Sequence, residues 1–181
     1  MKRIKYYLLL TILFFGNGLR AQDLNIAIAQ KAEAIENQLV QWRRHLHQYP
    51  ELGNREFKTA AYIMEQLKGL DLEIKNGVAK TGVVAILKGG KQGPVIALRA
   101  DMDALPVKER VNIPYASTDS TVYGKTKVAV MHACGHDAHV AMLIGTAKVL
   151  AGMKKDVAGT IKFIFQPAEE GPPEGEEGGA S

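Results

Sequence analysis

The spacing of apolar residues changes near Leu72, and this change restricts the chain to a fold that combines helices with strands. Residues 24–48 carry apolar side chains three and four positions apart, which is the period of an amphipathic helix. Pro50 ends that helix, because the residue before a proline avoids helical backbone angles. A second helix is predicted over residues 54–68, with Gly69 as its stop.

Beyond Leu72, apolar residues occur in short runs rich in branched side chains, which is typical of strands. Four strands are predicted, at Leu72–Lys75, Gly82–Lys88, Val95–Ala100 and Thr160–Gln166. The last run is continuous enough to be an inner strand. Residues Ala138–Ala151 are apolar on nearly all sides, which indicates a buried helix. Because helices alternate with apolar strands, we expect an α/β domain with a mostly parallel sheet flanked by helices.

The net charge of +4 comes from the first 21 residues, so it does not indicate nucleic-acid binding. Lys2, Arg3, Lys5 and Arg20 supply four of the 23 basic residues, and residues 1–21 contain no acidic residue. The other 19 basic residues are balanced by 19 acidic ones. No basic stripe is available to hold phosphates, and we expect no nucleic-acid partner.

Residues 1–21 have the pattern of a secretory signal peptide. A basic start is followed by the apolar run Tyr6–Phe15, by the helix-breaking residues 16–18, and by Ala21 at the expected cleavage site. A membrane anchor is the alternative, but a helix needs about 20 apolar residues to cross the hydrocarbon core. We therefore expect export with cleavage after Ala21, a periplasmic or secreted location, and no membrane contact after cleavage.

Cys134 is the only cysteine, so it has no partner for an internal disulfide. It lies in the histidine-rich stretch Met131–His139, separated from His136 by Gly135. Thiolate and imidazole are both good ligands for zinc-like ions, and a glycine allows a turn in which the two side chains converge. We expect Asp137 to hold the other ring nitrogen of a ligand histidine. Metal binding is favoured over the alternative, a histidine-rich helix cap with a buried thiol.

Glu169 and Glu170 directly follow the predicted inner strand. Adjacent carboxylates are costly to hold together unless cations neutralise them. With a metal ion present, one can ligate the ion while the other accepts a proton from water that the ion activates. Taken alone, the pair fits a solvated loop equally well.

Asp101 and Asp103 leave another predicted strand, where solvated acids are the ordinary interpretation. Their position favours a different one, because ligands of open α/β sheets bind outside the carboxyl ends of the strands. Both acidic pairs lie at such ends, and His136 leads into the buried helix. The sequence therefore predicts one site that combines all three groups.

Two further histidines, His45 and His47, lie in the first predicted helix. We expect them to belong to its polar surface. The alternative is that one of the two faces inward near the site.

Four segments together resemble one enzyme family. They are Arg43–His47 with Pro50–Leu52, Arg99–Leu105, His132–Asp137 and Gln166–Gly171, in that order. They resemble the amidohydrolases that include hippurate hydrolase, the plant indole-3-acetyl-amino-acid hydrolases and bacterial N-acetyl-diaminopimelate deacetylase. This family belongs to the aminoacylase and carboxypeptidase group of metallopeptidases, and the resemblance covers essentially everything after the signal.

The resemblance implies a di-metal catalytic domain of the aminopeptidase and carboxypeptidase type. Its implied reaction is hydrolysis of small N-acyl amino acids to a carboxylate and a free amino acid. It implies that Cys134, His136 and Glu170 ligate metal and that Glu169 is the general base. The implied cofactors are two divalent ions, Mn²⁺ or Zn²⁺.

The wider group keeps a His-x-Asp ligand pair where this chain has Asp101 and Asp103. Because Asp101 replaces the histidine, direct ligation by it is not expected. We expect Asp101, Asp103 and Asp137 to support the ligands from behind.

The family also places two more histidine ligands and an inserted dimerisation domain beyond the acidic pair. Residues 22–181 are therefore expected to be the N-terminal part of the catalytic domain, incomplete at the C-terminus, from a protein that forms homo-oligomers at full length. With three ligands named, these residues alone are expected to lack turnover. The alternatives are a dipeptidase or carboxypeptidase of the same group, or a truncated, non-catalytic metal-binding fragment.

Overall fold

The computed structural model describes residues 23–180, and the chain divides into two units at Glu36. In the first unit, the described residues are helical from 23 to 34 and form a turn at Ile35. The helix predicted over residues 24–48 is therefore two helices, of which α2 (Glu36–Gln48) is the second. None of the described helices is both long and apolar enough to span a bilayer. The predicted signal peptide lies outside the described residues.

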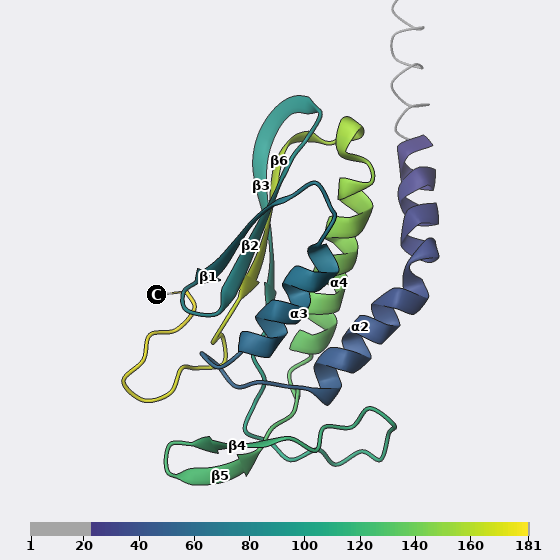
Figure 1. Ribbon diagram of the computed structural model, residues 1–181. Coiled ribbons are helices and arrows are strands. Elements are labelled where there is room, and N and C mark those ends of the chain that lie inside the picture. The colour runs from purple at the N-terminus through teal and green to yellow at the C-terminus, as the bar shows by residue number, and fades with distance from the viewer. Residues whose placement is uncertain (1–22, 181) are drawn as a thin grey trace, which may run out of the picture. The chain divides into compact units, whose positions relative to one another are not determined.

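The second unit contains a four-stranded sheet with helices packed on it (Figure 1). Its helices after α2 are α3 (Phe57–Leu67) and α4 (His136–Ala151). Its sheet strands are β1 (Glu73–Val78), β2 (Gly82–Lys88), β3 (Lys91–Asp101) and β6 (Ala158–Gln166). A single 3-10 turn, η1 (Lys154–Asp156), precedes β6. The predicted α/β class is confirmed.

The sheet has the order β1-β2-β6-β3, and it is mixed rather than mostly parallel. Only β3 and β6 run parallel, while β1 with β2 and β2 with β6 run antiparallel. The expectation of a mostly parallel sheet was wrong because tight turns, not helices, join β1 to β2 and β2 to β3, and a tight turn reverses the chain. The helical connection through α4 gives the one parallel pair. The prediction that β6 is an inner strand is confirmed.

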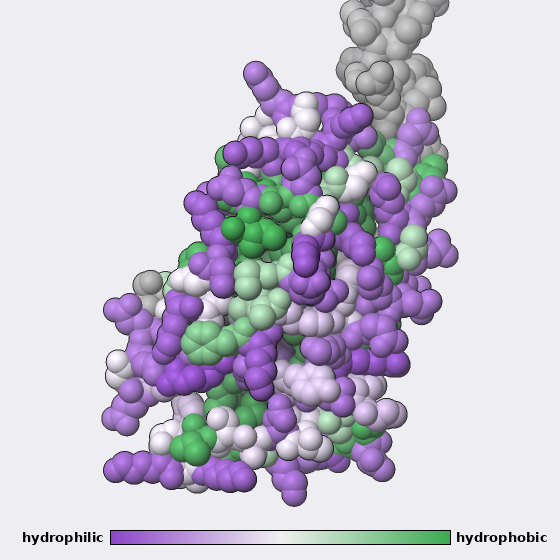
Figure 2. All heavy atoms as spheres, in the orientation of Figure 1, coloured by the Kyte–Doolittle hydropathy of each residue, from purple (hydrophilic) through white to green (hydrophobic). Residues whose placement is uncertain are grey.

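The hydrophobic core fills the space between one face of the sheet and the helices. Phe163 and Phe165 of β6 are almost fully buried there and lie opposite Ala85 and Val83 of β2. Helices α3 and α4 cover this face, and α2 adds Trp42 to the same cluster (Figure 1). Figure 2 shows that hydrophilic residues cover most of the visible surface, with apolar residues in small separate patches.

A long excursion, residues 105–131, leaves the sheet after β3 and returns just before α4. Backbone hydrogen bonds between Leu105 and Met131 join its two ends. It contains a hairpin of β4 (Ser120–Tyr123) and β5 (Thr126–Ala129), which no sequence prediction covered. All four residues of β4 are exposed, so the hairpin contributes little to the core.

The parallel pair positions the candidate site. Because β3 and β6 point the same way, Asp101 at the end of β3 lies directly opposite Gln166 at the end of β6. The backbone pairing continues one residue further, since the N–H of Met102 donates to the carbonyl of Gln166. The two acidic segments therefore leave the sheet side by side, as predicted from the sequence.

Candidate metal centre

Gly135 provides the turn that joins the cysteine to the histidine. It adopts φ 90° and ψ 13°, a left-handed conformation that residues with a Cβ rarely adopt, and it precedes the first residue of α4. As predicted, this turn lets Cys134 and His136 face one position. The ligand atoms of Cys134, His136 and Glu170 all lie within 4.8 Å of one another.

A second turn presents the two glutamates beyond β6. Ala168 has a positive φ of 46°, and its backbone N–H donates to Oε1 of Glu56 at 2.8 Å. The other oxygen of Glu56 accepts a hydrogen bond from the Thr81 hydroxyl at 2.6 Å. Glu56 is completely buried, so it fixes the turn that carries Glu169 and Glu170. Its role was not predicted, since a glutamate within a helical pattern gives no sign that it is buried.

The Nε2 atom of His136 lies at the centre of the cluster. It is 3.8 Å from Oε1 of Glu170, 3.8 Å from Oε2 of Glu169, and 3.6 Å from Oδ1 of Asp101. Two ligands bound to the same tetrahedral zinc-like ion at normal distances lie about 3.3–3.6 Å apart. The spacing therefore fits a shared cation with only small side-chain movement.

Asp103 fixes the orientation of the His136 ring. Nδ1 of His136 donates to the backbone carbonyl of Asp103 at 2.9 Å and lies 3.3 Å from its carboxylate. With Nδ1 carrying the proton, Nε2 has a free lone pair for a metal ion. The carboxylate of Asp103 also accepts the backbone N–H of Glu170 at 2.9 Å, so one buried aspartate positions two of the three ligands.

Excess negative charge raises the proton affinity of the ligands. Burial opposes protonation of His136, but hydrogen bonding to Asp103 and the charge of Asp101 outweigh it and raise its pKa to about 9. The pKa of Cys134 rises to about 11, first because its thiol donates to Glu170, and further through desolvation and the charges of the neighbouring carboxylates. A thiol, an imidazole and several carboxylates with this surplus of negative charge match the donor set of a divalent cation.

Comparisons with known proteins show which proteins this chain resembles. Residues 97–181 match the model of Peptidase family M20/M25/M40. The chain is 48% identical over 136 residues to the N-acetyl-L-cysteine deacetylase of Bacillus subtilis, an alignment that covers 75% of this chain and 31% of the deacetylase. Residues 97–181 therefore belong to a Peptidase M20 domain.

Two further relatives extend the comparison. Thermostable carboxypeptidase 1 of Saccharolobus solfataricus is 45% identical over 149 residues, covering 82% of this chain and 36% of the relative. A solved structure of a dinuclear metal-binding M20 peptidase from Bacillus subtilis matches with a TM-score of 0.68 at 45% identity, covering 76% of this chain and 36% of that one. The chain therefore spans about a third of the length of the relatives it matches.

Asp101 faces the same nitrogen of His136 as the two glutamates, so the prediction that it supports the ligands from behind was wrong. It is paired with a residue that was not predicted as part of the site. Its Oδ1 accepts a hydrogen bond from Nδ1 of His139 at 2.6 Å, one helical turn beyond His136. Asp101, His136 and His139 form a second group whose ligand atoms lie within 4.8 Å of one another. His139 thus orients Asp101 toward the candidate centre.

Asp137 does not hold a ligand histidine, which corrects the sequence prediction. Its Oδ2 accepts hydrogen bonds from Nε of Arg43 at 2.8 Å and from Nδ1 of His47 at 2.9 Å. The reason is geometric: residues next to each other on a helix point in different directions, so Asp137 faces α2 while His136 faces the site. Asp103 has the predicted role instead.

The two histidines of α2 have different environments. His47 is 5% exposed and faces inward, so the alternative interpretation is correct for this residue. His45 stacks on the ring of Tyr62 at 3.9 Å between α2 and α3. Helical period alone did not distinguish them, because the partners of His47 are far away in the sequence.

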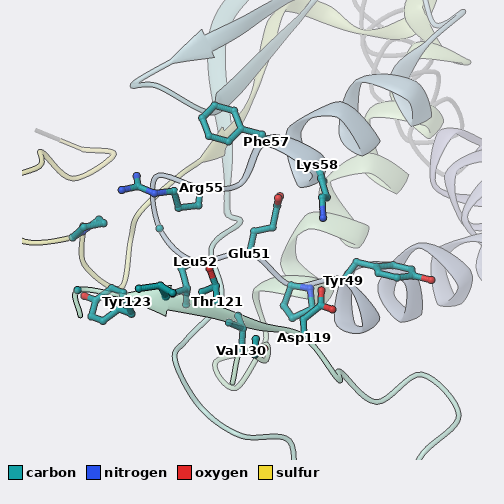
Figure 3. Close-up of a pocket in the computed structure, with 16 residues that line it drawn as sticks. Tyr49, Glu51, Leu52, Arg55, Phe57, Lys58, Asp119, Thr121, Tyr123 and Val130 are labelled. Carbon is teal, nitrogen blue, oxygen red and sulfur yellow. The ribbon is translucent and has the colours of Figure 1, made fainter. Parts of the chain in front are cut away.

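A pocket of about 390 Å³ lies elsewhere, between the α2–α3 connection and the β4–β5 hairpin (Figure 3). Tyr49, Glu51 and Phe57 line it from one side, and Tyr123 lines it from the hairpin. Its lining residues do not include Cys134 or the glutamate pair. The candidate centre is therefore identified by its converging ligands and not by this pocket.

Proposed function

We propose that this protein is a metal-dependent amidohydrolase that cleaves N-acyl amino acids into a carboxylate and a free amino acid. The observation that carries the proposal is the convergence of Cys134, His136 and Glu170, with Glu169 beside them. The similarity to a deacetylase of N-acetyl-L-cysteine supports this substrate class.

We assign Cys134, His136 and Glu170 as metal ligands. His136 is 2% exposed and held by Asp103, so its Nε2 needs no reorganisation to bind an ion. Glu170 is fixed through its own backbone N–H, which leaves its carboxylate free to face the thiol. When bound, divalent ions would polarise the acyl carbonyl and lower the pKa of water.

We assign Glu169 as the general base. It lies next to the ligand group without belonging to the closest trio, and its side chain is 37% exposed. Its carboxylate lies 3.8 Å from the guanidinium of Arg99, which is itself held by Gln166 at 2.7 Å. Arg99 thus limits the movement of Glu169, so that the carboxylate can accept a proton from water and return it to the leaving amine.

Two ions per site is part of the proposal, supported by the solved M20 relative described as dinuclear. The mixed sulfur, nitrogen and oxygen donors suit Zn²⁺, and the carboxylates also accept Mn²⁺. Metal analysis of the purified protein by mass spectrometry, together with reactivation of a chelated sample by each ion, tests the choice.

A carboxypeptidase or dipeptidase is the second candidate, because one close relative is a thermostable carboxypeptidase. The same residues would perform the same amide hydrolysis on a peptide. Rates on a panel of N-acyl amino acids and on matched dipeptides would distinguish the two. Faster hydrolysis of the dipeptides by a large factor would overturn the N-acyl amino acid proposal.

We also propose export, with residues 1–21 removed, and assembly of the whole protein into homo-oligomers. The basic start and the apolar run Tyr6–Phe15 support export. Mass spectrometry of the mature N-terminus tests it: Gln22 as the first residue is expected, and an intact Met1 on a cytoplasmic protein would refute it.

A further inference from the structure

A buried polar network lies behind the segment that carries the candidate ligands. His47 of α2 is its central residue, with a side chain only 6% exposed. Nδ1 of His47 lies 2.9 Å from Oδ2 of Asp137, and Nε2 lies 2.8 Å from Oε2 of Glu109. The Arg43 guanidinium reaches the same oxygen of Asp137 at 2.8 Å. One imidazole therefore joins two carboxylates from separate parts of the chain.

The two carboxylates belong to segments that frame the candidate centre. Asp137 directly follows His136 in the first turn of α4. Glu109 belongs to the excursion of residues 105–131, which starts two residues after Asp103 and ends three residues before Cys134. His47 thus connects the helical layer both to the ligand segment and to the excursion.

Because Asp137 is buried, losing these contacts would cost free energy. Oδ1 of Asp137 has no hydrogen-bond partner among the described residues, so Oδ2 makes all the contacts that compensate for burying this carboxylate. Arg43 is 38% exposed and therefore contributes less than a buried partner would. If the His47 donor to Asp137 were removed, the carboxylate would lose the only buried donor that the described residues give it. A buried carboxylate in that situation moves toward water, because leaving it unpaired is expensive.

We propose that His47 is a positioning residue for the metal centre. By holding Asp137 it fixes the first turn of α4, and with it the direction of the His136 ring. Through Glu109 it also fixes the excursion relative to that turn. The inference rests on the proposed metal site, since it assigns to His47 the task of keeping one ligand in place.

Two substitutions separate the two contacts of His47. Asparagine carries its amide nitrogen at about the position of Nδ1, so His47→Asn keeps a donor for Asp137 and loses the contact with Glu109. Glutamine carries its nitrogen near the position of Nε2, so His47→Gln does the reverse. His45→Gln is the matched control, because His45 lies on the same helix but stacks on Tyr62 away from the network.

The experiment is a Co²⁺ titration of the full 181-residue chain and its variants, followed by absorption spectroscopy. We expect His47→Gln to weaken Co²⁺ binding by roughly 10–100-fold, as outer contacts of metal ligands do when removed. His47→Asn should stay within about threefold of the unchanged chain, and His45→Gln should match it. Equal Co²⁺ affinity in all four proteins would overturn the inference.

Thermal unfolding without metal separates positioning from a purely structural role. A structural role would lower the melting temperature of both His47 variants and leave Co²⁺ affinity and spectrum unchanged, which contradicts the inference. If His47→Gln does not fold, Asp137→Asn, which keeps the side-chain shape, must weaken Co²⁺ binding for the inference to survive. No Co²⁺ binding by the unchanged chain would instead refute the metal site itself, which distinguishes the two failures.

Discussion

The ligand segment of residues 132–139 has two sides with opposite character. Its front carries Cys134, which is exposed, and faces Glu169 and Glu170, which are 37% and 26% exposed. Its back carries Asp137, which is 1% exposed and bonded to His47 and Arg43. The front has more negative charge than its neighbouring cations balance, whereas most charged atoms at the back have partners.

The difference shows how the two sides contribute. The hydrogen bonds at the back fix the backbone of the first turn of α4, and the hydrogen bond that Asp103 accepts fixes the ring of His136. The front is left with acceptors that protons occupy when no metal is present, as the raised pKa values of Cys134 and His136 show. A rigid back and a charge-rich front are what a preorganised cation site requires.

The largest expected effect separates the two glutamates of the front. In the whole enzyme, Glu169→Gln should lower the rate by about 10²–10⁴-fold while metal content stays unchanged, because only the proton acceptor is removed. Glu170→Gln is the matched variant and should lose metal instead. Measurement of kcat and of bound metal in both variants checks this. Near-normal turnover by Glu169→Gln would show that the base lies elsewhere.

The second prediction concerns how metal affinity at the front, through Cys134 and His136, depends on pH. The pKa values of His136 and Cys134 are raised to about 9 and about 11, so below pH 9 both hold protons in the metal-free chain. A metal ion must displace both protons, so its affinity should rise with pH, by about 100-fold per unit between pH 6 and 8. Zn²⁺ titrations at three pH values test this. Affinity that does not change with pH would mean that neither group is a ligand.

The smallest expected effect is on stability, and it concerns Glu56, which holds the turn that carries Glu169 and Glu170. Glu56→Ala leaves the buried N–H of Ala168 and the hydroxyl of Thr81 without their acceptor, and should lower the free energy of unfolding by roughly 2–4 kcal/mol. Glu56→Gln keeps an acceptor for Ala168 and should cost less than half as much. Urea denaturation of both variants measures the difference. Equal losses would show that burial of the chain segment, and not the acceptor, matters at this position.

Much of this site could be predicted from the sequence, because its signals are local. The Cys134-Gly135-His136 spacing and the acidic residues at strand ends lie within a few positions of one another, and parallel β3 and β6 bring them together. The boundaries of β2 also agree with the prediction.

The features that were missed depend on contacts between distant segments. His47 and Asp137 are 90 positions apart, and Glu56 and Ala168 are 112 apart, so no spacing rule connects them. The predicted direction of the strands was also wrong. A run of apolar residues predicts a strand but does not indicate whether that strand runs parallel or antiparallel to its neighbours. The β4–β5 hairpin was overlooked because β4 is exposed and β5 is only partly buried, so neither strand has the apolar run of a core strand.

The most direct test of the account is whether Cys134 binds the metal through its thiolate. Co²⁺ added to the 181-residue chain should produce a thiolate-to-cobalt charge-transfer band in the near ultraviolet, and Zn²⁺ should abolish it by displacement. In Cys134→Ala the band should be absent and Co²⁺ affinity should fall by at least about 100-fold, more than for an outer contact. Co²⁺ binding without that band, or equal affinity in Cys134→Ala, would contradict the assignment of this front as a metal centre.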